Sequence, residues 1–206
     1  MIEILTNADR ARKPALFRQM FEARAAIFSD RLGWDVTVVD GQETDRYDEL
    51  EHVLYVVAID QCGDMTASLR LLPTTGDTMM QNEFSDFFNE PVDVVSPTIV
   101  ECTRFCVHPP KAGASLDNVR LRSSELSIGL CSLCLDAGFE HVLGLYNAQM
   151  DNVYRRIGWR PELLAEARSL RGHLRVGLWE VSDAAIANMH AVADGYRFRT
   201  PLKAAA

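Results

Sequence analysis

The chain has 206 residues, of which 48% are hydrophobic and 24% charged, and its formal net charge is −8. These values predict one globular domain, residues 1–206, with enough apolar side chains for a complete core. The negative charge argues against nucleic acid as a partner, because a phosphate backbone selects basic surfaces. The apolar runs are too short for a bilayer, the N-terminus has no signal core and the 5 cysteines are scattered. We therefore expect a cytoplasmic protein without a membrane partner.

Hydrophobic periodicity and turn residues divide the chain into strands and helices. The sequence predicts, in chain order, a strand at 2–5, a helix at 14–32, an irregular acidic segment at 35–52, strands at 53–59 and 65–72, a short helix at 80–89, a strand at 98–107, a loop at 108–116, a helix at 118–138, a strand at 141–146, a helix at 148–157, a strand at 174–181 and a helix from Ser182. Strands that first adjoin and then alternate with helices indicate an α/β fold with a mixed central sheet and helices on both faces.

Standard cofactor and metal motifs are missing from the sequence, which lacks GxGxxG, a Walker loop, HExxH and GxSxG. Cys131 and Cys134 lie in the middle of a predicted helix, which is typical of packing thiols rather than of a redox pair. The 5 histidines show no ligand spacing, so we expect no metal site.

Several charged side chains fall in segments that are otherwise apolar: Arg24, Arg70, Glu101 and Arg104. Buried charges need partners, and the acidic segment offers Asp45 and Asp48. One interpretation is an ion-pair network that only ties this segment to the sheet. The other is a site in which arginines hold a ligand carboxylate and a glutamate acts as a general base.

The strand 99-IVECTRFCVHP-109 poses a geometric problem, because Glu101 and Arg104 are three residues apart. Strand side chains alternate between faces, so the two charges point in opposite directions in a regular strand. A bulge near residues 101–105 adds one residue and brings both side chains to the same face. We predict this bulge; in the unbulged alternative, Arg104 is paired on the opposite face, behind the site.

Three blocks of residues follow one another in the first half of the chain. The first comprises Arg24, Phe28, Trp34 and 43-ETDRYD-48, the second is 68-SLRLLPTT-75 and the third is 101-ECTRFCV-107. In order and spacing they resemble the acyl-homoserine-lactone synthases, the bacterial autoinducer synthases of quorum sensing. Phe84 falls where that family keeps an aromatic residue. The match covers residues 1–110, and the C-terminal half matches only in layout.

This resemblance implies a fold similar to the acetyl-CoA-dependent N-acetyltransferases. Those enzymes hold the CoA pyrophosphate with Q/R-x-x-G-x-G/A at a helix N-terminus, whereas this chain has 108-HPPKAGAS-115. The departure suits an enzyme that takes its acyl group from the phosphopantetheine arm of a carrier protein. The implied reaction joins S-adenosyl-L-methionine to an acyl-acyl-carrier-protein as an amide, then closes the lactone and releases methylthioadenosine. S-adenosyl-L-methionine is a substrate there, so no cofactor is expected.

The resemblance also implies roles for the charged and aromatic side chains. Glu101 is the expected base for the amine, and backbone N–H groups around Phe105 are expected to donate to the thioester oxygen. The three arginines hold the acidic segment through Asp45 and Asp48, and one of them meets the substrate carboxylate. Phe28 and Trp34 either stack on the substrate or pack in the core. The expected catalytic set is Glu101, Arg104, Glu43 and Asp45, and the expected substrate-binding set is Arg24, Phe28, Trp34, Asp48, Arg70, Phe84 and Phe105.

An acyl pocket is expected between the helix at 118–138 and the strand at 141–146. Its candidate lining residues are Leu126, Val142, Gly144, Leu145 and Met150. Family members that prefer 3-oxo chains often carry a threonine on this strand, and the matching position here is Gly144 or Leu145. This difference hints at an unsubstituted or otherwise different chain. Residues 151–175 hold six arginines against three acids, which favours an acidic carrier protein or is simply a solvated face; an acyl-CoA donor stays open.

Three rival functions differ in what they predict. A plain N-acyltransferase that uses acyl-CoA on a small amine releases no methylthioadenosine. An inactive binding protein of the same fold binds ligand without turnover. A purely structural ion-pair network in an unrelated α/β protein makes the substitution Glu101→Gln costly for stability and irrelevant to activity.

Overall fold

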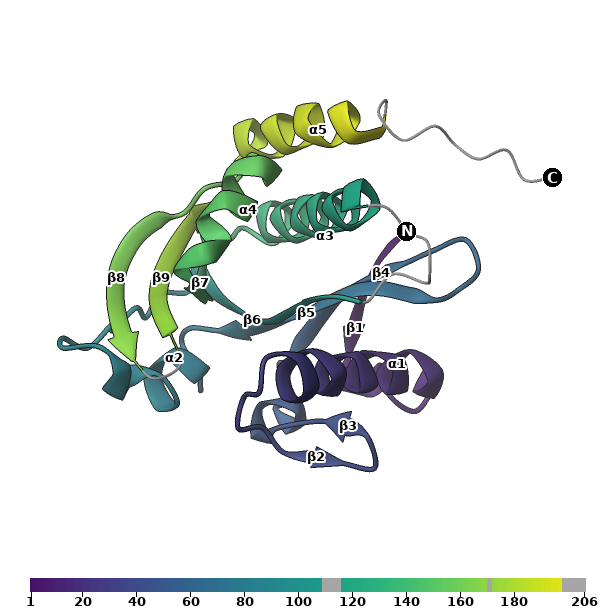
Figure 1. Cartoon of the computed structure of the whole chain (residues 1–206), viewed down its shortest axis with the longest axis horizontal. Helices are drawn as coiled ribbons and strands as arrows, with labels where there is room; N and C mark the ends of the chain where they lie inside the picture. The colour runs from purple at the N-terminus through teal and green to yellow at the C-terminus, as the bar shows by residue number, and fades with distance from the viewer. Residues whose placement is uncertain (109–115, 170–171, 198–206) are drawn as a thin grey trace.

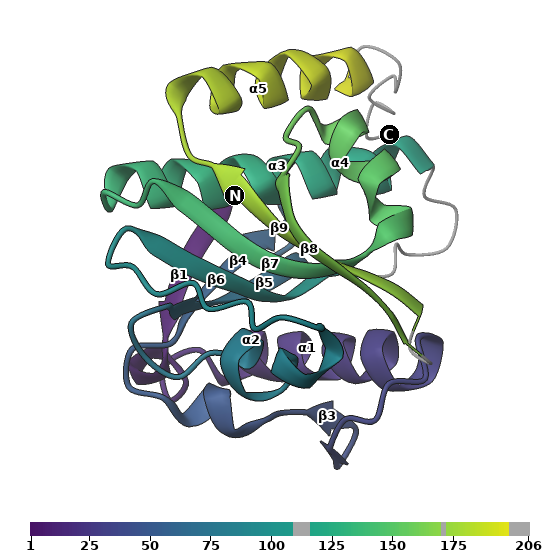
Figure 2. The same ribbon diagram turned by 90° about the vertical axis from the view of Figure 1, so that its left-hand side faces the viewer.

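The computed structural model describes residues 1–108, 116–169 and 172–197. A central sheet has the strand order β1-β4-β5-β6-β7-β9-β8, with α1 on one face and α3 and α5 on the other (Figures 1 and 2). The strands are β1 Ile2–Thr6, β4 Leu54–Ile59, β5 Met65–Pro73, β6 Ile99–Val107, β7 His141–Asn147, β8 Glu162–Ser169 and β9 Gly172–Glu180. The helices are α1 Pro14–Arg24, α2 Met79–Asn82, α3 Leu116–Asp136, α4 Asp151–Ile157 and α5 Asp183–Arg197. The predicted mixed sheet with helices on both faces is confirmed.

Alternation along the central strands produces a core on each face of the sheet. Leu69 and Leu71 of β5 are buried together with Leu126 of α3, whereas Leu72 is buried together with Phe21 of α1. Full burial of a side chain of this size contributes about 1.5–3 kcal/mol. The two cores therefore fix α1 and α3 on opposite sides of the strands that carry the charged residues.

Four segments differ from the sequence-based expectation. The helix predicted at 14–32 changes after α1 into a π-helix at Ala25–Arg31, and the helix predicted at 80–89 contains only α2 and one 3-10 turn. The acidic segment contains a small hairpin, β2 Val38–Val39 and β3 Gln42–Glu43. The sequence missed β8, because ELLAEARS is rich in helix formers, and its pairing with β9 overrides that propensity.

The predicted bulge is confirmed in β6. Ser68 of β5 pairs with Cys106 and Arg70 with Thr103, so β6 has one residue more than β5 across this step. Arg104 lies at the extra position with a φ of 52°, a left-handed conformation that is uncommon for a residue with a side chain. The local backbone therefore departs from a regular strand at the arginine for which the bulge was predicted.

The strands β6 and β7 run parallel and pair over a short stretch only. Their partners extend from Ile99 with His141 to Glu101 with Leu143. Beyond these pairs both strands continue, to Val107 and Asn147, without further pairing between them. The two strands therefore separate just beyond Glu101. The candidate site lies where they separate.

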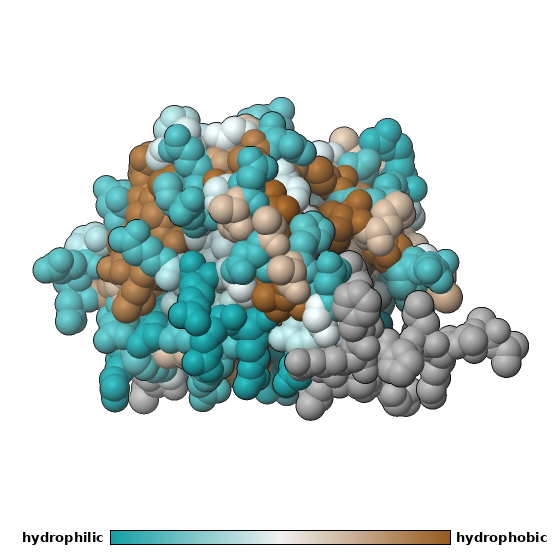
Figure 3. All heavy atoms as spheres, turned by 90° about the horizontal axis from the view of Figure 1, so that it is seen from above, coloured by the Kyte–Doolittle hydropathy of each residue, from teal (hydrophilic) through white to brown (hydrophobic). Residues whose placement is uncertain are grey.

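The outer face above α5 shows separate hydrophobic patches among hydrophilic side chains (Figure 3). Within the described ranges, no helix is long and apolar enough to cross a membrane.

Candidate active site

A cavity of about 370 Å³ lies where β6 and β7 diverge, and its lining comes from both faces of the sheet. On the α1 side the lining includes Phe28, Arg31, Trp34, Met79, Phe84 and Arg104. On the α3 side it includes Ser127, Leu130, Val142, Leu145, Met150, Tyr154, Trp159 and Trp179. Glu101, Thr103, Phe105 and Gly144 contribute from the two strands. One continuous space therefore joins a charged and aromatic section to an apolar one.

Glu101 lies at the junction of these sections with its carboxylate fixed by backbone. The N–H of Met79 donates to Oε2 at 2.8 Å, and the N–H of Met80 donates to Oε1 at 2.9 Å. Burial raises the pKa of Glu101 to about 7, although these two hydrogen bonds and the charges of Arg70 and Arg104 act in the opposite direction. A carboxylate with this pKa can take and return a proton near neutral pH.

A buried network of three arginines and three carboxylates supports the α1 side: Arg24, Arg70, Arg104, Glu43, Asp45 and Asp48. Arg24 binds Asp48 through both terminal nitrogens, at 2.9 and 2.8 Å, and donates from Nε to Glu43 at 2.5 Å. Arg70 bonds Asp45 and also Asp48, the latter at 2.9 Å. Arg104 reaches Glu43 at 2.8 Å and Asp45 at 2.9 Å. The prediction that these arginines hold the acidic segment is confirmed, with Glu43 as a further anchor.

The charges of this network balance, three against three. Arg24, with Arg70, holds the pKa of Asp48 well below its usual range despite burial. A substrate carboxylate therefore meets no spare cation inside the network. Arg31, which was not among the residues predicted for the site, lines the cavity and has no carboxylate partner among the described residues. The sequence feature that could have indicated Arg31 is its position between Phe28 and Trp34.

The aromatic side chains of the α1 side lie beside Arg104. The rings of Phe28 and Trp34 have centroids 5.1 Å apart, and the Cζ of Arg104 is 5.2 Å from the Phe28 centroid. Phe84 and Phe105 line the same cavity. By contrast, the cavity lining does not include five of the predicted residues, which lie behind it: Glu43, Asp45, Asp48, Arg24 and Arg70. Their catalytic and binding roles stay predictions, and the structure places them as supports.

Four of the five residues predicted for the acyl pocket line the apolar section of the cavity. Val142, Gly144, Leu145 and Met150 line the cavity as expected, but Leu126 does not. Leu126 is fully buried in the core beneath α3. Because each helical residue turns by about 100°, the neighbouring position presents the next face, and Ser127 lines the cavity instead.

Four aromatic rings surround the apolar section: Tyr146, Tyr154, Trp159 and Trp179. The ring centroids of Tyr154 and Trp179 are 4.9 Å apart. Gly144 leaves room for this packing, because a Cβ there would lie 3.2 Å from the Trp179 ring. These rings give the section a fixed shape.

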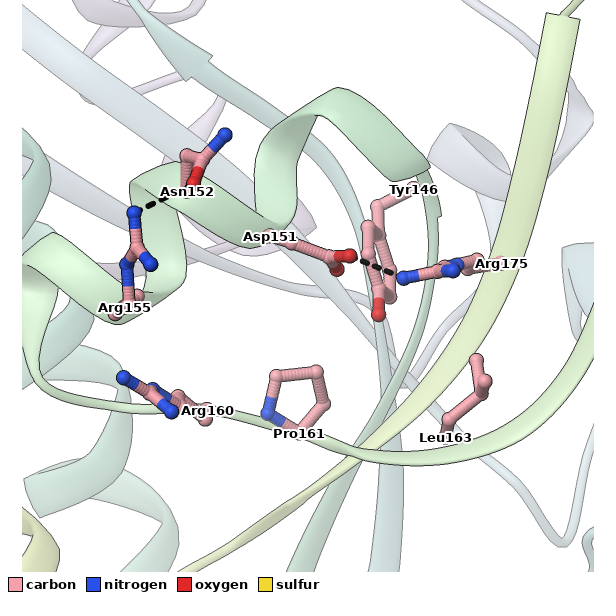
Figure 4. A pocket seen from close by; sticks show the side chains of 8 residues that line it. All are labelled: Tyr146, Asp151, Asn152, Arg155, Arg160, Pro161, Leu163 and Arg175. Carbon is pink, nitrogen blue, oxygen red and sulfur yellow. Dashed lines mark hydrogen bonds and ion pairs between the residues drawn. The ribbon is translucent and has the colours of Figure 1, made fainter.

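A second pocket of about 340 Å³ opens on the surface nearby (Figure 4). Its lining includes Arg155, Arg160 and Arg175, and it shares Tyr146 with the cavity. Arg175 is engaged by Asp151 and Glu166. Arg155 donates to the neutral Asn152, at 2.7 Å. The segment 109–115, where N-acetyltransferases hold the CoA pyrophosphate, lies outside the described residues. Among the described residues, no group of three metal-ligating side chains comes together.

Comparison with known proteins gives a family match over most of the chain. The autoinducer synthase family model matches residues 8–187. An acyl-homoserine-lactone synthase of Rhizobium etli is 52% identical over 182 residues, covering 88% of this chain and 85% of the relative. One from Agrobacterium fabrum (strain C58 / ATCC 33970) is 28% identical over 157 residues, covering 76% of this chain and 74% of the relative.

Solved structures show the same fold. A CoA-dependent acyl-homoserine lactone synthase, MesI, matches with a TM-score of 0.79 at 23% identity, covering 94% of this chain and 95% of that chain. A putative N-acetyltransferase from Lactobacillus plantarum matches with a TM-score of 0.56 at 14% identity, covering 88% of this chain and 99% of that chain. The chain therefore belongs to the autoinducer synthase family and is an acyl-homoserine-lactone synthase, a transferase.

Proposed function

We propose that the protein makes its lactone from S-adenosyl-L-methionine and an acyl-acyl-carrier-protein. The observation that supports this most directly is the position of Glu101 in one cavity that joins a charged aromatic section to an apolar section. A structural neighbour, the CoA-dependent synthase BjaI, is described with SAM and isopentyl-CoA and matches with a TM-score of 0.81 at 20% identity, covering 94% of this chain and 89% of that chain. Two substrates of unlike polarity fit the two sections.

Glu101 acts as the base in the amide-forming step. It takes a proton from the methionine ammonium, and the free amine attacks the thioester carbonyl. Backbone N–H groups at the bulge near Phe105 donate to the oxygen as its charge develops. The tetrahedral intermediate then loses a second proton from its nitrogen and expels the carrier thiolate. One of the two protons passes through Glu101 to the thiolate, and the other goes to solvent.

The lactone closes in a second step that needs no further base. The methionine carboxylate attacks its own γ-carbon, the C–S bond breaks, and methylthioadenosine leaves as a neutral thioether. S-adenosyl-L-methionine is consumed, so the reaction requires no cofactor. Phe28 and Trp34 attract the sulfonium through their ring faces. The guanidinium of Arg31, which has no carboxylate partner in the described part of the chain, pairs with the substrate carboxylate.

The surface pocket supports a carrier protein as the donor. Arg155 and Arg160 line a pocket that shares Tyr146 with the apolar section. Acidic carriers are steered by such exposed cations. Both substrates are cytoplasmic, so we place the protein there.

A substrate panel tests the proposal. The purified protein receives S-adenosyl-L-methionine with acyl-carrier-protein or acyl-CoA thioesters, and mass spectrometry follows methylthioadenosine and the lactone. We expect equal amounts of both products and a higher kcat/KM with the carrier. A higher kcat/KM with acyl-CoA reassigns the donor. An acylated amine formed without methylthioadenosine makes the protein a plain N-acyltransferase.

A further inference from the structure

The carboxylate of Glu101 is held by a very short helix. Both backbone N–H groups that donate to it, those of Met79 and Met80, belong to α2, which has only four residues. A single helical turn is costly to form and gains little from its own hydrogen bonds. The position of the two donors therefore depends on the contacts that anchor α2 to the rest of the protein.

The side chain of Met79 anchors α2 to the buried network. Its sulfur accepts a hydrogen bond from Nη2 of Arg70 at 3.2 Å and from Nη1 of Arg104 at 3.5 Å. A thioether is a weak acceptor, but both donors are charged and Arg70 is fully buried, which strengthens the interaction. Asp45 and Asp48 also bind Arg70, so the sulfur meets a guanidinium that is fixed in place.

Met80 provides an internal contrast. Its N–H donates to the same carboxylate, but its side chain is buried in a core cluster with Phe88, Leu143 and Val176. In the part of the chain that the structure describes, its sulfur accepts no hydrogen bond. The two adjacent methionines thus share a backbone role and differ in what their side chains bind.

The proton affinity of Glu101 responds to these donors. Burial raises its pKa, and the two backbone hydrogen bonds lower it, as do the charges of Arg70 from β5 and Arg104 from β6. The adjacent thiol of Cys102 has a pKa raised by burial, so it is neutral near pH 7. The partners of Glu101 across the sheet are uncharged: Leu72 and Leu143. Loss of a backbone hydrogen bond therefore raises the pKa of Glu101 further.

We propose that Met79 is a positioning residue whose thioether, held by Arg70 and Arg104, fixes the N–H donors that orient Glu101. The buried network thereby acts on the reacting centre, although most of its members do not line the cavity. A base must lie within hydrogen-bond reach of the proton it takes, so a loosened α2 slows proton transfer. The inference rests on the proposed function and adds a residue to it.

The test substitutes the sulfur at nearly constant volume and keeps the backbone N–H. In Met79→Leu we expect kcat to fall about tenfold with little change in the KM for S-adenosyl-L-methionine, because a misplaced base slows the chemistry rather than binding. The acid limb of kcat/KM should move up by about 0.5–1 pH unit, the size of one net hydrogen bond to the ionised carboxylate. Hydrogen exchange of the amide at position 79 should become faster than in wild type.

Two other methionines give matched substitutions. Met20→Leu lies in the same apolar core as Met79 but does not line the cavity, and it should leave the acid limb and the exchange rate unchanged. Met80→Leu keeps a backbone donor to Glu101 and should move the acid limb less than Met79→Leu does.

An acid limb or an exchange rate that stays at the wild-type value in Met79→Leu overturns the inference. A displacement of equal size in Met20→Leu or Met80→Leu also overturns it, and so does a rise in KM alone, which would make Met79 a wall residue. Lactone formation by wild type shows that the proposed function stands in either case. An acid limb that persists in Glu101→Gln refutes the proposed base, whereas the exchange rate still tests the anchoring of α2.

Discussion

The two sections of the cavity are built in opposite ways. On the α1 side, a balanced network of arginines and carboxylates stands behind a few aromatic residues, and each network charge has a defined partner. On the α3 side, the wall is shaped by packed rings such as Tyr154 and Trp179 and by the absence of a side chain at Gly144. The first section is specified by electrostatic pairing and the second by shape.

This difference explains how each section tolerates change. A buried charge that loses its partner is strongly destabilising, so the residues of the network depend on one another. Apolar packing accepts swaps of similar volume at modest cost. We therefore expect substitutions on the α1 side to abolish folding or reaction, and substitutions on the α3 side to alter which acyl chain is used.

The largest expected effect lies where the two sections meet. Glu101→Gln removes the base and should lower kcat about 100- to 10,000-fold. In wild type the ionised carboxylate is the active form, so kcat/KM should fall as the pH drops below about 7. Steady-state kinetics with a pH profile checks both. Glu83→Gln, a half-exposed control close by, should change kcat little; a fully active Glu101→Gln removes Glu101 as the base.

Asp48→Asn should have the next largest effect, on stability. It leaves Arg24 and Arg70 with one carboxylate fewer, at a cost of about 3–5 kcal/mol in the free energy of unfolding. Because the folded pKa of Asp48 is depressed, its contribution is present above its unfolded pKa and is lost as the pH falls. Urea denaturation from neutral to acid pH should show this loss in wild type and a flatter profile in the variant.

The control for this experiment is the neighbouring exposed residue. Glu49 has a side chain that is 71% exposed and pairs with Arg10. Glu49→Gln should change the free energy of unfolding by less than about 0.5 kcal/mol. An equal loss in the free energy of unfolding for Asp48→Asn and Glu49→Gln would show that the buried network stabilises the fold no more than an exposed ion pair does.

A smaller effect is expected on the α3 side. Gly144→Ala places a methyl group 3.2 Å from the Trp179 ring and should narrow the cavity, shifting kcat/KM towards shorter acyl chains about tenfold, the scale of moderate overpacking. Lactone profiling by mass spectrometry with chains of several lengths measures this shift. Gly129→Ala places its methyl group nearest the Ile2 side chain, at 3.0 Å, and should leave the profile unchanged. A parallel shift in both variants would point to a global disturbance.

The smallest effect is expected at the surface pocket. Arg155→Glu with Arg160→Glu should lower kcat/KM for an acyl-carrier-protein about fivefold at low salt, through slower association, and the effect should shrink as salt is added. The kcat/KM with acyl-CoA should change less. Arg18→Glu, on exposed α1 surface, serves as the charge-reversal control. Equal losses with both donors would place these arginines outside carrier docking.

The sequence predicted the α1 side far better than the α3 side. Charges within apolar segments are conspicuous, so Arg24, Arg70 and Glu101 could be identified and their pairing with the acidic segment anticipated. Arg31 escaped notice because an exposed arginine at the end of a helix is ordinary. On the α3 side, a one-residue difference in helical phase separated the predicted Leu126 from the observed Ser127.

The sequence alone thus determined the α/β class, the order of most elements and the need for a bulge, because alternation and charge burial are local rules. Only the tertiary structure decided that Arg104 adopts a left-handed conformation, that β8 pairs at the edge of the sheet, and which side of α3 faces the cavity. These features depend on contacts between distant segments, whose energies outweigh local propensity. They cannot be predicted from residue spacing along the chain.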